Sequence, residues 1–286
     1  MTRKLRARLS LPAAALRVFD FSVGEMLWSR RTIFMGLVVG GPVVIALVLR
    51  VLSTFELMSI DWTINGRPVM LSGPSVFGLM VWVFYLRFAV PALGAFYGTA
   101  LIADEVEDKT ITCLFTRPIA RGAVLVGKYL AYLMCSTVIV LPSVILVYFL
   151  VVPIQGGGIG QNFPLLVVDL VLIAVGLAVY GAVFGLVGAW FNRPLLTGLV
   201  FVFGWEPIAV AIPGYMKNLT VAYYLQGLVP HAVPQEATVS FLRAVLERVQ
   251  EPPSFWASIL ALFLIWTVSL FVSTRVVEAR EYVLDQ

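Results

Sequence analysis

The chain has 286 residues, of which 60% are hydrophobic and only 13% are charged, and its mean hydropathy is +0.95. Soluble domains carry roughly 45–50% apolar and about 25% charged residues, so this composition excludes a sizeable soluble domain and predicts an integral membrane protein. The net charge of +4 does not indicate nucleic-acid binding, because the basic residues flank apolar runs. A single histidine excludes any metal site that needs two.

The first expected element is an amphipathic helix within residues 1–31. Its apolar residues recur at helical spacing: Leu16, Phe19, Val23 and Leu27. Because this stripe adjoins the pair Arg30-Arg31 and an apolar run, we expect the helix to lie at the inner membrane surface. The alternative is an ordinary helix that packs on the rest of the protein.

Six apolar runs follow, each about as long as, or longer than, the roughly 20 residues that a bilayer-crossing helix requires. They cover residues 32–52, 75–103, 123–151, 165–191, 195–213 and 255–275. The fifth run is the weakest, because Glu206, Pro207 and Pro213 interrupt it. We therefore expect a broken fifth span, and an external segment, 214–254, follows it. The sequence therefore predicts an all-α membrane protein with a six-span domain over 32–275 and a cytoplasmic tail over 276–286.

The basic residues predict the orientation of these spans. Fourteen of the twenty Lys and Arg residues fall on the side of the N-terminus, and four fall on the other side. Because cytoplasmic segments carry an excess of Lys and Arg, we expect both termini to be cytoplasmic. The expected location is a bacterial cytoplasmic membrane.

The connector between the second and third spans is the most distinctive segment. It reads EVEDKTITCLFTRPIARGAVLVGKYLA over residues 105–131. Pro118 can bound a short rigid helix, and charged side chains beside it can set the register with a partner protein. The alternative is a solvated loop with ordinary positive-inside charges. The residues singled out are Glu105, Glu107, Thr110, Leu114, Pro118, Arg121, Gly127 and Lys128.

These residues match, at the same spacing, the pattern E-x-E-x-G-T, a leucine, P-[IV]-x-R and G-K. The chain thereby resembles the type-2 family of ATP-binding-cassette (ABC) exporter permeases, with one departure at Lys109, where the family usually has Gly. The resemblance implies that this loop forms a coupling helix that docks on a separate cytoplasmic ABC ATPase. It also implies two copies of that ATPase, which bind ATP and Mg, and a second permease subunit, identical or related. No cofactor is expected in this chain.

One stretch imitates a nucleotide-binding motif. Residues Gly122 to Lys128 fit G-x-x-x-x-G-K, but Tyr129 stands where Ser or Thr would hold magnesium. No strand precedes the stretch, and an apolar span follows it. We therefore expect no nucleotide site in this chain and no catalytic residue.

Two charged residues lie within apolar runs. Arg87 is about halfway along the second run and Glu206 about halfway along the fifth. A charge at the bilayer centre costs at least ~2.5–3.5 kcal/mol, so such groups usually find partners or water. We hypothesise that they face the bundle interior, where they pair or line the translocation route. The alternative is that each extends to an interface or binds backbone carbonyls.

Small residues in the spans predict close helix packing. Gly94-x-x-x-Gly98 in the second span and Gly181-x-x-x-Gly185 in the fourth permit backbones to approach. Packing within one subunit is the favoured interpretation, and a dimer interface is the alternative.

Other classes of function stay open at this point. The acidic cluster Asp104, Glu105, Glu107 and Asp108 would allow an intramembrane enzyme with a weak magnesium site, and such an enzyme would be active alone. An ATP-independent transporter or channel would show gradient-driven flux without ATP. A membrane anchor for a maturation or surface-machinery complex is the last alternative.

Overall fold

A computed structural model of the chain describes residues 11–27, 30–55, 63–64, 67–68, 72–102, 121–211, 215–229 and 253–279. Within these residues the regular structure is almost entirely helical. The longest continuous helices are α2 (Arg30–Thr54), α7 (Arg121–Val151), α8 (Ile159–Trp190) and α13 (Phe255–Ala279). Between α2 and the next span, β1 (Thr63–Ile64) and β2 (Arg67–Pro68) form a short antiparallel pair.

The second span is a composite of four consecutive helical segments. They are α3 (Gly73–Met80), η1 (Val81–Ala89), α4 (Val90–Leu93) and η2 (Gly94–Gly98). Segments η1 and η2 are π-helical, which is a wider winding than the α-helix and is frequent at functional sites. Together with the residues that follow, the composite forms an apolar helix from Gly73 to Ile102.

Five helices in the described residues are long and apolar enough to cross a membrane. They are Thr32–Thr54, Gly73–Ile102, Gly122–Val151, Ile159–Trp190 and Phe255–Ala279. These helices overlap five of the six predicted spans. The predicted span 195–213 corresponds to a shorter apolar helix, Pro194–Ala209, built from α9 (Pro194–Val200), η4 (Phe201–Trp205) and α10 (Glu206–Ala211).

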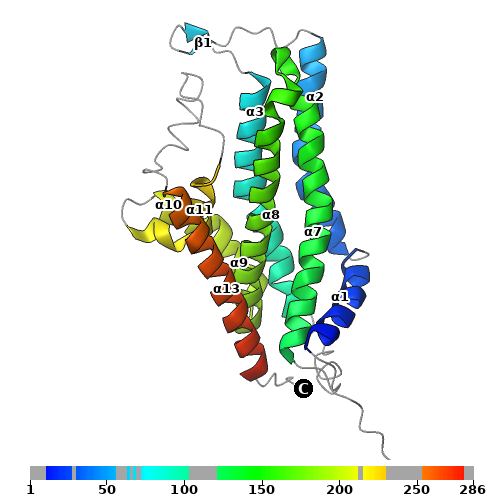
Figure 1. Cartoon of the computed structure of the whole chain (residues 1–286), viewed down its shortest axis with the longest axis vertical. Coiled ribbons are helices and arrows are strands. Elements are labelled where there is room, and N and C mark those ends of the chain that lie inside the picture. The colour runs from blue at the N-terminus through cyan, green and yellow to red at the C-terminus, as the bar shows by residue number, and fades with distance from the viewer. Residues whose placement is uncertain are drawn as a thin grey trace, which may run out of the picture.

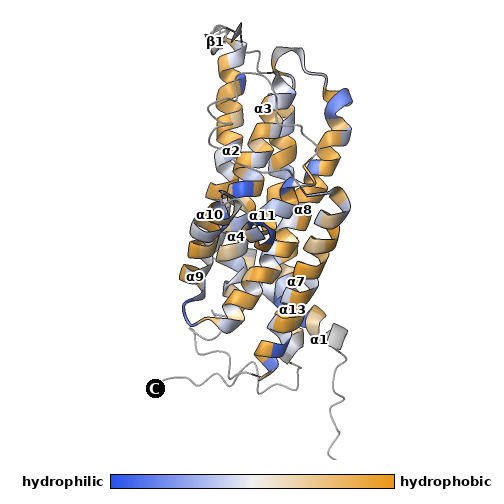
Figure 2. Ribbon diagram, turned by 90° about the vertical axis from the view of Figure 1, so that its left-hand side faces the viewer, coloured by the Kyte–Doolittle hydropathy of each residue, from blue (hydrophilic) through white to orange (hydrophobic). Residues whose placement is uncertain are grey.

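The long helices form a bundle whose outer surface is apolar. Helix α7 contacts α2 and α8, and α13 contacts α8 and α7, while α9, α10 and α11 (Val221–Gln226) lie to one side of α8 (Figure 1). The helices are hydrophobic along most of their length (Figure 2). On α13, large side chains are exposed, among them Trp256, Phe263 and Phe271. Exposed apolar side chains on long helices are what a lipid environment requires.

Glycines let the second span and α8 approach closely, as their spacing predicts. A Cβ atom on Gly94 would stand 2.8 Å from the Cβ of Tyr180, and one on Gly98 would stand 2.8 Å from that of Phe184. On α8 itself, a Cβ on Gly181 would meet the ring of Tyr132 at 2.2 Å. These glycine pairs therefore serve packing inside one subunit.

Proline positions account for two of the π-helical segments. Segment η1 ends at Ala89, two residues before Pro91, and η4 ends at Trp205, two residues before Pro207. A proline inside a helix lacks an N–H donor, and its ring clashes with the carbonyl four residues earlier. Widening the preceding turn relieves that clash, so the helix passes through Pro207 and continues to Ala211 instead of breaking there.

Some helices extend beyond the predicted spans or lie between them. Helix α8 begins at Ile159, six residues before the predicted start of the fourth span, and in its first turn the Asn162 side-chain amide donates a hydrogen bond of 2.8 Å to the Gly158 carbonyl. Helix α13 continues to Ala279, beyond the predicted start of the tail at 276. Within the predicted external segment, η5 (Tyr215–Leu219) and α11 are helical, whereas 230–252 lie outside the described residues.

The N-terminal helix α1 (Leu11–Leu27) is present as predicted and packs against α7 (Figure 1). The contact face differs from the predicted apolar stripe: Ala15 is buried, while Leu16 is 62% exposed. The approach is close, since a Cβ on Gly127 of α7 would stand 2.6 Å from the Ala15 carbonyl and 2.8 Å from the Val18 Cβ. Helix α1 thus presents one face to the protein and leaves Leu16 outside that contact.

Candidate functional site

The structure places three of the predicted coupling-loop residues. Arg121 is the first residue of α7, and Gly127 and Lys128 lie about two turns further along the same helix, with Lys128 buried at 8% exposure. The other predicted residues of this loop lie outside the described residues: Glu105, Glu107, Thr110, Leu114 and Pro118. Their role in docking an ATPase stays a prediction.

The stretch that imitates a nucleotide-binding motif is helical. Residues Gly122 to Lys128 form the first two turns of α7. A Cβ on Gly122 would meet the Glu278 carboxylate of α13 at 3.0 Å, and Gly127 lies against α1. A phosphate-binding loop needs a bend between a strand and a helix, so these two glycines serve helix packing instead.

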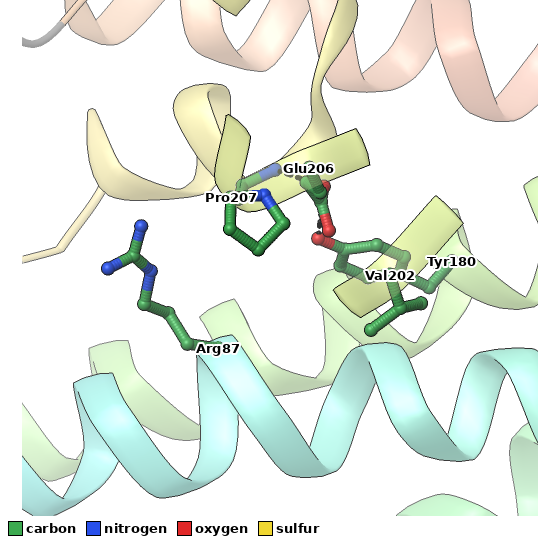
Figure 3. A pocket seen from close by; sticks show the side chains of 6 residues that line it. Arg87, Tyr180, Val202, Glu206 and Pro207 are labelled. Carbon is green, nitrogen blue, oxygen red and sulfur yellow. Dashed lines mark hydrogen bonds between the residues drawn. The ribbon is translucent and has the colours of Figure 1, made fainter. Parts of the chain in front are cut away.

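The two charged residues of the apolar runs line one pocket. Arg87 comes from η1 and Glu206 from the start of α10, and Tyr180, Val202, Pro207 and Ala222 complete the lining (Figure 3). The pocket has a volume of about 30 Å³, more than the roughly 10–15 Å³ that a single water molecule requires. Helices α10 and α11, which carry part of the lining, lie near the middle height of the bundle (Figures 1 and 2).

Glu206 is the best-anchored residue of the pocket. Its side chain is 4% exposed. The Tyr180 hydroxyl donates a hydrogen bond of 2.6 Å to Oε1, and the Ala222 backbone N–H donates another of 3.0 Å to the same oxygen. These donors belong to α8 and α11, so one carboxyl group joins three helices.

The bond from Ala222 also caps a helix. The first N–H groups of a helix have no partner inside it, and the usual cap is a side chain at the preceding residue. That residue is Thr220, whose hydroxyl instead donates to the Lys217 carbonyl at 2.7 Å. Glu206 therefore supplies the acceptor that α11 lacks locally.

Arg87 is held differently. Its guanidinium stands over the Trp82 ring, with Cζ 5.7 Å from the ring centroid, a cation–π contact. Among the described residues it forms no hydrogen bond, and no salt bridge of 4.0 Å or less joins it to Glu206. Figure 3 shows the guanidinium extended on one side of the pocket and the Glu206 carboxylate turned toward Tyr180 on the other. Whether the two charges pair or line a route for cargo stays a prediction.

The sequence identified the two charged residues but not their uncharged partners. Tyr180 is completely buried in α8, and buried tyrosine hydroxyls usually find hydrogen-bond partners, so a tyrosine inside an apolar span was the available signal. Ala222 contributes only its backbone, and no sequence pattern marks that role.

No group of three or more His, Cys, Asp or Glu side chains capable of holding a metal occurs in the part of the chain that the structure describes. The acidic cluster at 104–108, which would support an intramembrane enzyme, lies outside that part. The site that can be described is therefore the pocket between η1, α8, α10 and α11.

Comparison with known protein families gives a match over most of the chain. The family described as ABC-2 family transporter protein matches residues 43–281, a range that includes all of the pocket residues and the predicted coupling loop. A comparison with curated proteins gave no match. The apolar helices agree with a multi-pass membrane component of an ABC transporter. The chain belongs to the ABC-2 family of transporter proteins.

Proposed function

We propose that this chain is the permease subunit of an ATP-driven exporter and that a separate ATPase supplies the energy. The observation that carries the proposal is the family match over residues 43–281, because membrane components of this family generally work with an ABC ATPase. The loop before α7 carries the motif of the type-2 exporter permeases. Export, rather than import, rests on that resemblance.

In this scheme two copies of the ATPase dock on two permease subunits from the cytoplasm. Each ATPase would contact the loop between the second span and α7, with Glu105, Glu107, Thr110, Leu114, Pro118, Arg121 and Lys128 as its coupling residues. Both chain termini would be cytoplasmic, and the complex would lie in a bacterial cytoplasmic membrane. The short apolar helix Pro194–Ala209 would act as the fifth of the six spans, completed by the helices that follow it.

The contacts of α7 suggest how movement of the loop would spread. Helix α1 lies against Gly127, and Glu278 of α13 lies against Gly122, both within two turns of the end of the loop. A push on the loop would therefore move α1, α7 and α13 together. Helix α8 would follow, since Tyr129 and Tyr132 of α7 donate hydrogen bonds to its Ala178 and Leu177 carbonyls, at 2.8 Å and 3.1 Å.

Purification from the native membrane tests this proposal. The chain is tagged at its C-terminus, extracted in mild detergent, and its partners are identified by mass spectrometry. We expect an ATPase that carries its own phosphate-binding loop, and we expect Arg121→Glu to reduce its recovery. Arg193→Glu is the matched control, because Arg193 is an exposed basic residue between α8 and α9, outside the loop.

Recovery of the chain without any ATPase, together with flux or catalysis that ignores ATP, would reject the proposal. Equal loss of the ATPase in the Arg121 and Arg193 variants would reject the loop as the docking site while leaving the partnership intact.

A further inference from the structure

Among the described residues, the Arg87 cation in the pocket has no hydrogen-bond acceptor and no salt bridge of 4.0 Å or less. The Arg87 guanidinium has the Trp82 ring as its neighbour and no acceptor among the described residues. By contrast, Arg275 near the end of α13 forms a salt bridge of 3.8 Å with Glu278. Cations inside apolar spans are costly and occur where they meet anions, carbonyls or water. Within the described residues the donors of Arg87 are therefore open to an acceptor such as water or an anion.

Glu206 does not provide that acceptor in this arrangement. Its carboxyl group is almost completely buried and accepts two hydrogen bonds from Tyr180 and Ala222. A cationic ligand would have to displace these donors to reach it. The accessible charge in the pocket is therefore positive.

The surface beside Arg87 is apolar and aromatic. Phe88, the next residue along η1, and Phe203, on η4, lie with ring centroids 5.9 Å apart. Phe88 is 44% exposed and Phe203 is 51% exposed. The two rings connect η1, which carries Arg87, with η4, which directly precedes Glu206. A guanidinium in the pocket and exposed aromatic rings on two elements that line it suit a molecule with a charged head and an apolar body.

We propose that Arg87 binds the anionic head group, a phosphate or carboxylate, of an amphipathic molecule whose apolar part lies on Phe88 and Phe203. The inference rests on the proposed permease function, because it names the substrate class for that route. A guanidinium presents several donors in a planar fork that fits two oxygens of a phosphate or carboxylate. Because the pocket is small, with a volume of about 30 Å³, the head group meets Arg87 at the pocket mouth. Glu206 is then a positioning residue, because its hydrogen bonds fix α10 and α11, two of the helices that line the pocket.

Binding of radiolabelled dodecyl phosphate to the full-length chain, purified in dodecyl maltoside with whatever partners accompany it, tests this inference. Arg87→Gln should lower the affinity by about tenfold to a hundredfold, because hydrogen bonds to charged groups are lost. Arg87→Lys keeps the positive charge but lacks the planar fork of donors. Its affinity should lie between that of the wild-type chain and that of Arg87→Gln. Arg50→Gln is the control, since Arg50 also lies on a long apolar helix, α2, away from the pocket. Monodisperse elution of each variant establishes that it is folded.

Competition distinguishes an amphipathic ligand from a free anion. Unlabelled dodecyl phosphate should displace the label, whereas inorganic phosphate at the same concentration should not. Equal displacement by inorganic phosphate would overturn the amphipathic ligand. Unchanged affinity in Arg87→Gln, or an equal loss in Arg50→Gln, would overturn the assignment of Arg87.

The same preparations separate this inference from the proposed function. ATPase recovery is measured beside ligand binding for each variant. Normal ATPase recovery with unchanged binding in Arg87→Gln overturns the ligand site and leaves the permease function standing. Absence of an ATPase from every preparation overturns the permease function, and the ligand site is then judged by the binding data alone.

Discussion

Replacement of Glu206 by alanine should release α11 from the bundle. The substitution removes the acceptor for two hydrogen bonds, from the Tyr180 hydroxyl at 2.6 Å and the Ala222 N–H at 3.0 Å. Hydrogen bonds to charged groups contribute about 1.5–3 kcal/mol each, so the pair contributes about 3–6 kcal/mol before other terms. Removing a buried carboxylate also removes its desolvation cost, which leaves a net local loss of about 2–4 kcal/mol.

Hydrogen exchange measures this loss at the affected helix. A net loss of about 2–4 kcal/mol raises the opening equilibrium by about 30-fold to 1,000-fold. The Ala222 amide, followed by mass spectrometry of peptides that cover α11, should exchange faster by that factor. Because Thr220 does not cap the helix, no local side chain substitutes for Glu206.

Tyr180→Phe is the matched variant. It removes one donor to Glu206 and leaves the bond to the Ala222 N–H, so the exchange of α11 should rise much less. Exchange of the Ala222 amide at the wild-type rate in Glu206→Ala would refute the assignment of Glu206 as the link between α8, α10 and α11.

Three further substitutions test the packing of the bundle. Gly127→Leu should detach α1 from α7, which limited proteolysis would detect as faster cleavage of α1. Gly24→Leu is the control, because a Cβ there meets nothing within 4 Å, and α1 should stay protected in that variant. Equal proteolysis of the two variants would contradict the contact between α1 and α7. Gly181→Ala should lower the thermal unfolding temperature in detergent, because a Cβ there stands 2.2 Å from the Tyr132 ring and overpacking costs about 1–3 kcal/mol. An unchanged unfolding temperature would contradict the close contact between Gly181 and Tyr132. Trp266→Phe removes the 2.7 Å indole hydrogen bond from α13 to α7 and should cost about 1 kcal/mol, measured by denaturant titration; wild-type stability would show that the bond contributes nothing.

The sequence was sufficient for features that depend on hydropathy and small residues. Five long helices coincide with apolar runs because a span needs a continuous apolar surface. The packing of Gly94 and Gly98 against α8 followed from their spacing, because only glycine allows backbones that close. Arg87 and Glu206 were identifiable because charges are rare in spans.

Other features depend on contacts that no linear pattern encodes. The α7 contact of α1 uses Ala15 and Val18, small residues that a hydrophobic stripe does not select. The passage of the helix through Pro207 depends on a π-helical turn before it, whereas the sequence predicted a break. The cap on α11 comes from Glu206, sixteen residues before Ala222, beyond the reach of local capping rules.

Thiol labelling of the pocket in the presence of its ATPase is the most direct test of the central claim, that ATP bound elsewhere moves these spans. Val202, which lines the pocket and is 4% exposed, is replaced by Cys in a chain whose Cys113 and Cys135 are changed to Ser. The labelling rate by a water-soluble reagent is measured in the purified complex with and without a non-hydrolysable ATP analogue. The account predicts a rate that changes with the analogue only when the ATPase is present. A rate that ignores both the nucleotide and the ATPase would contradict it.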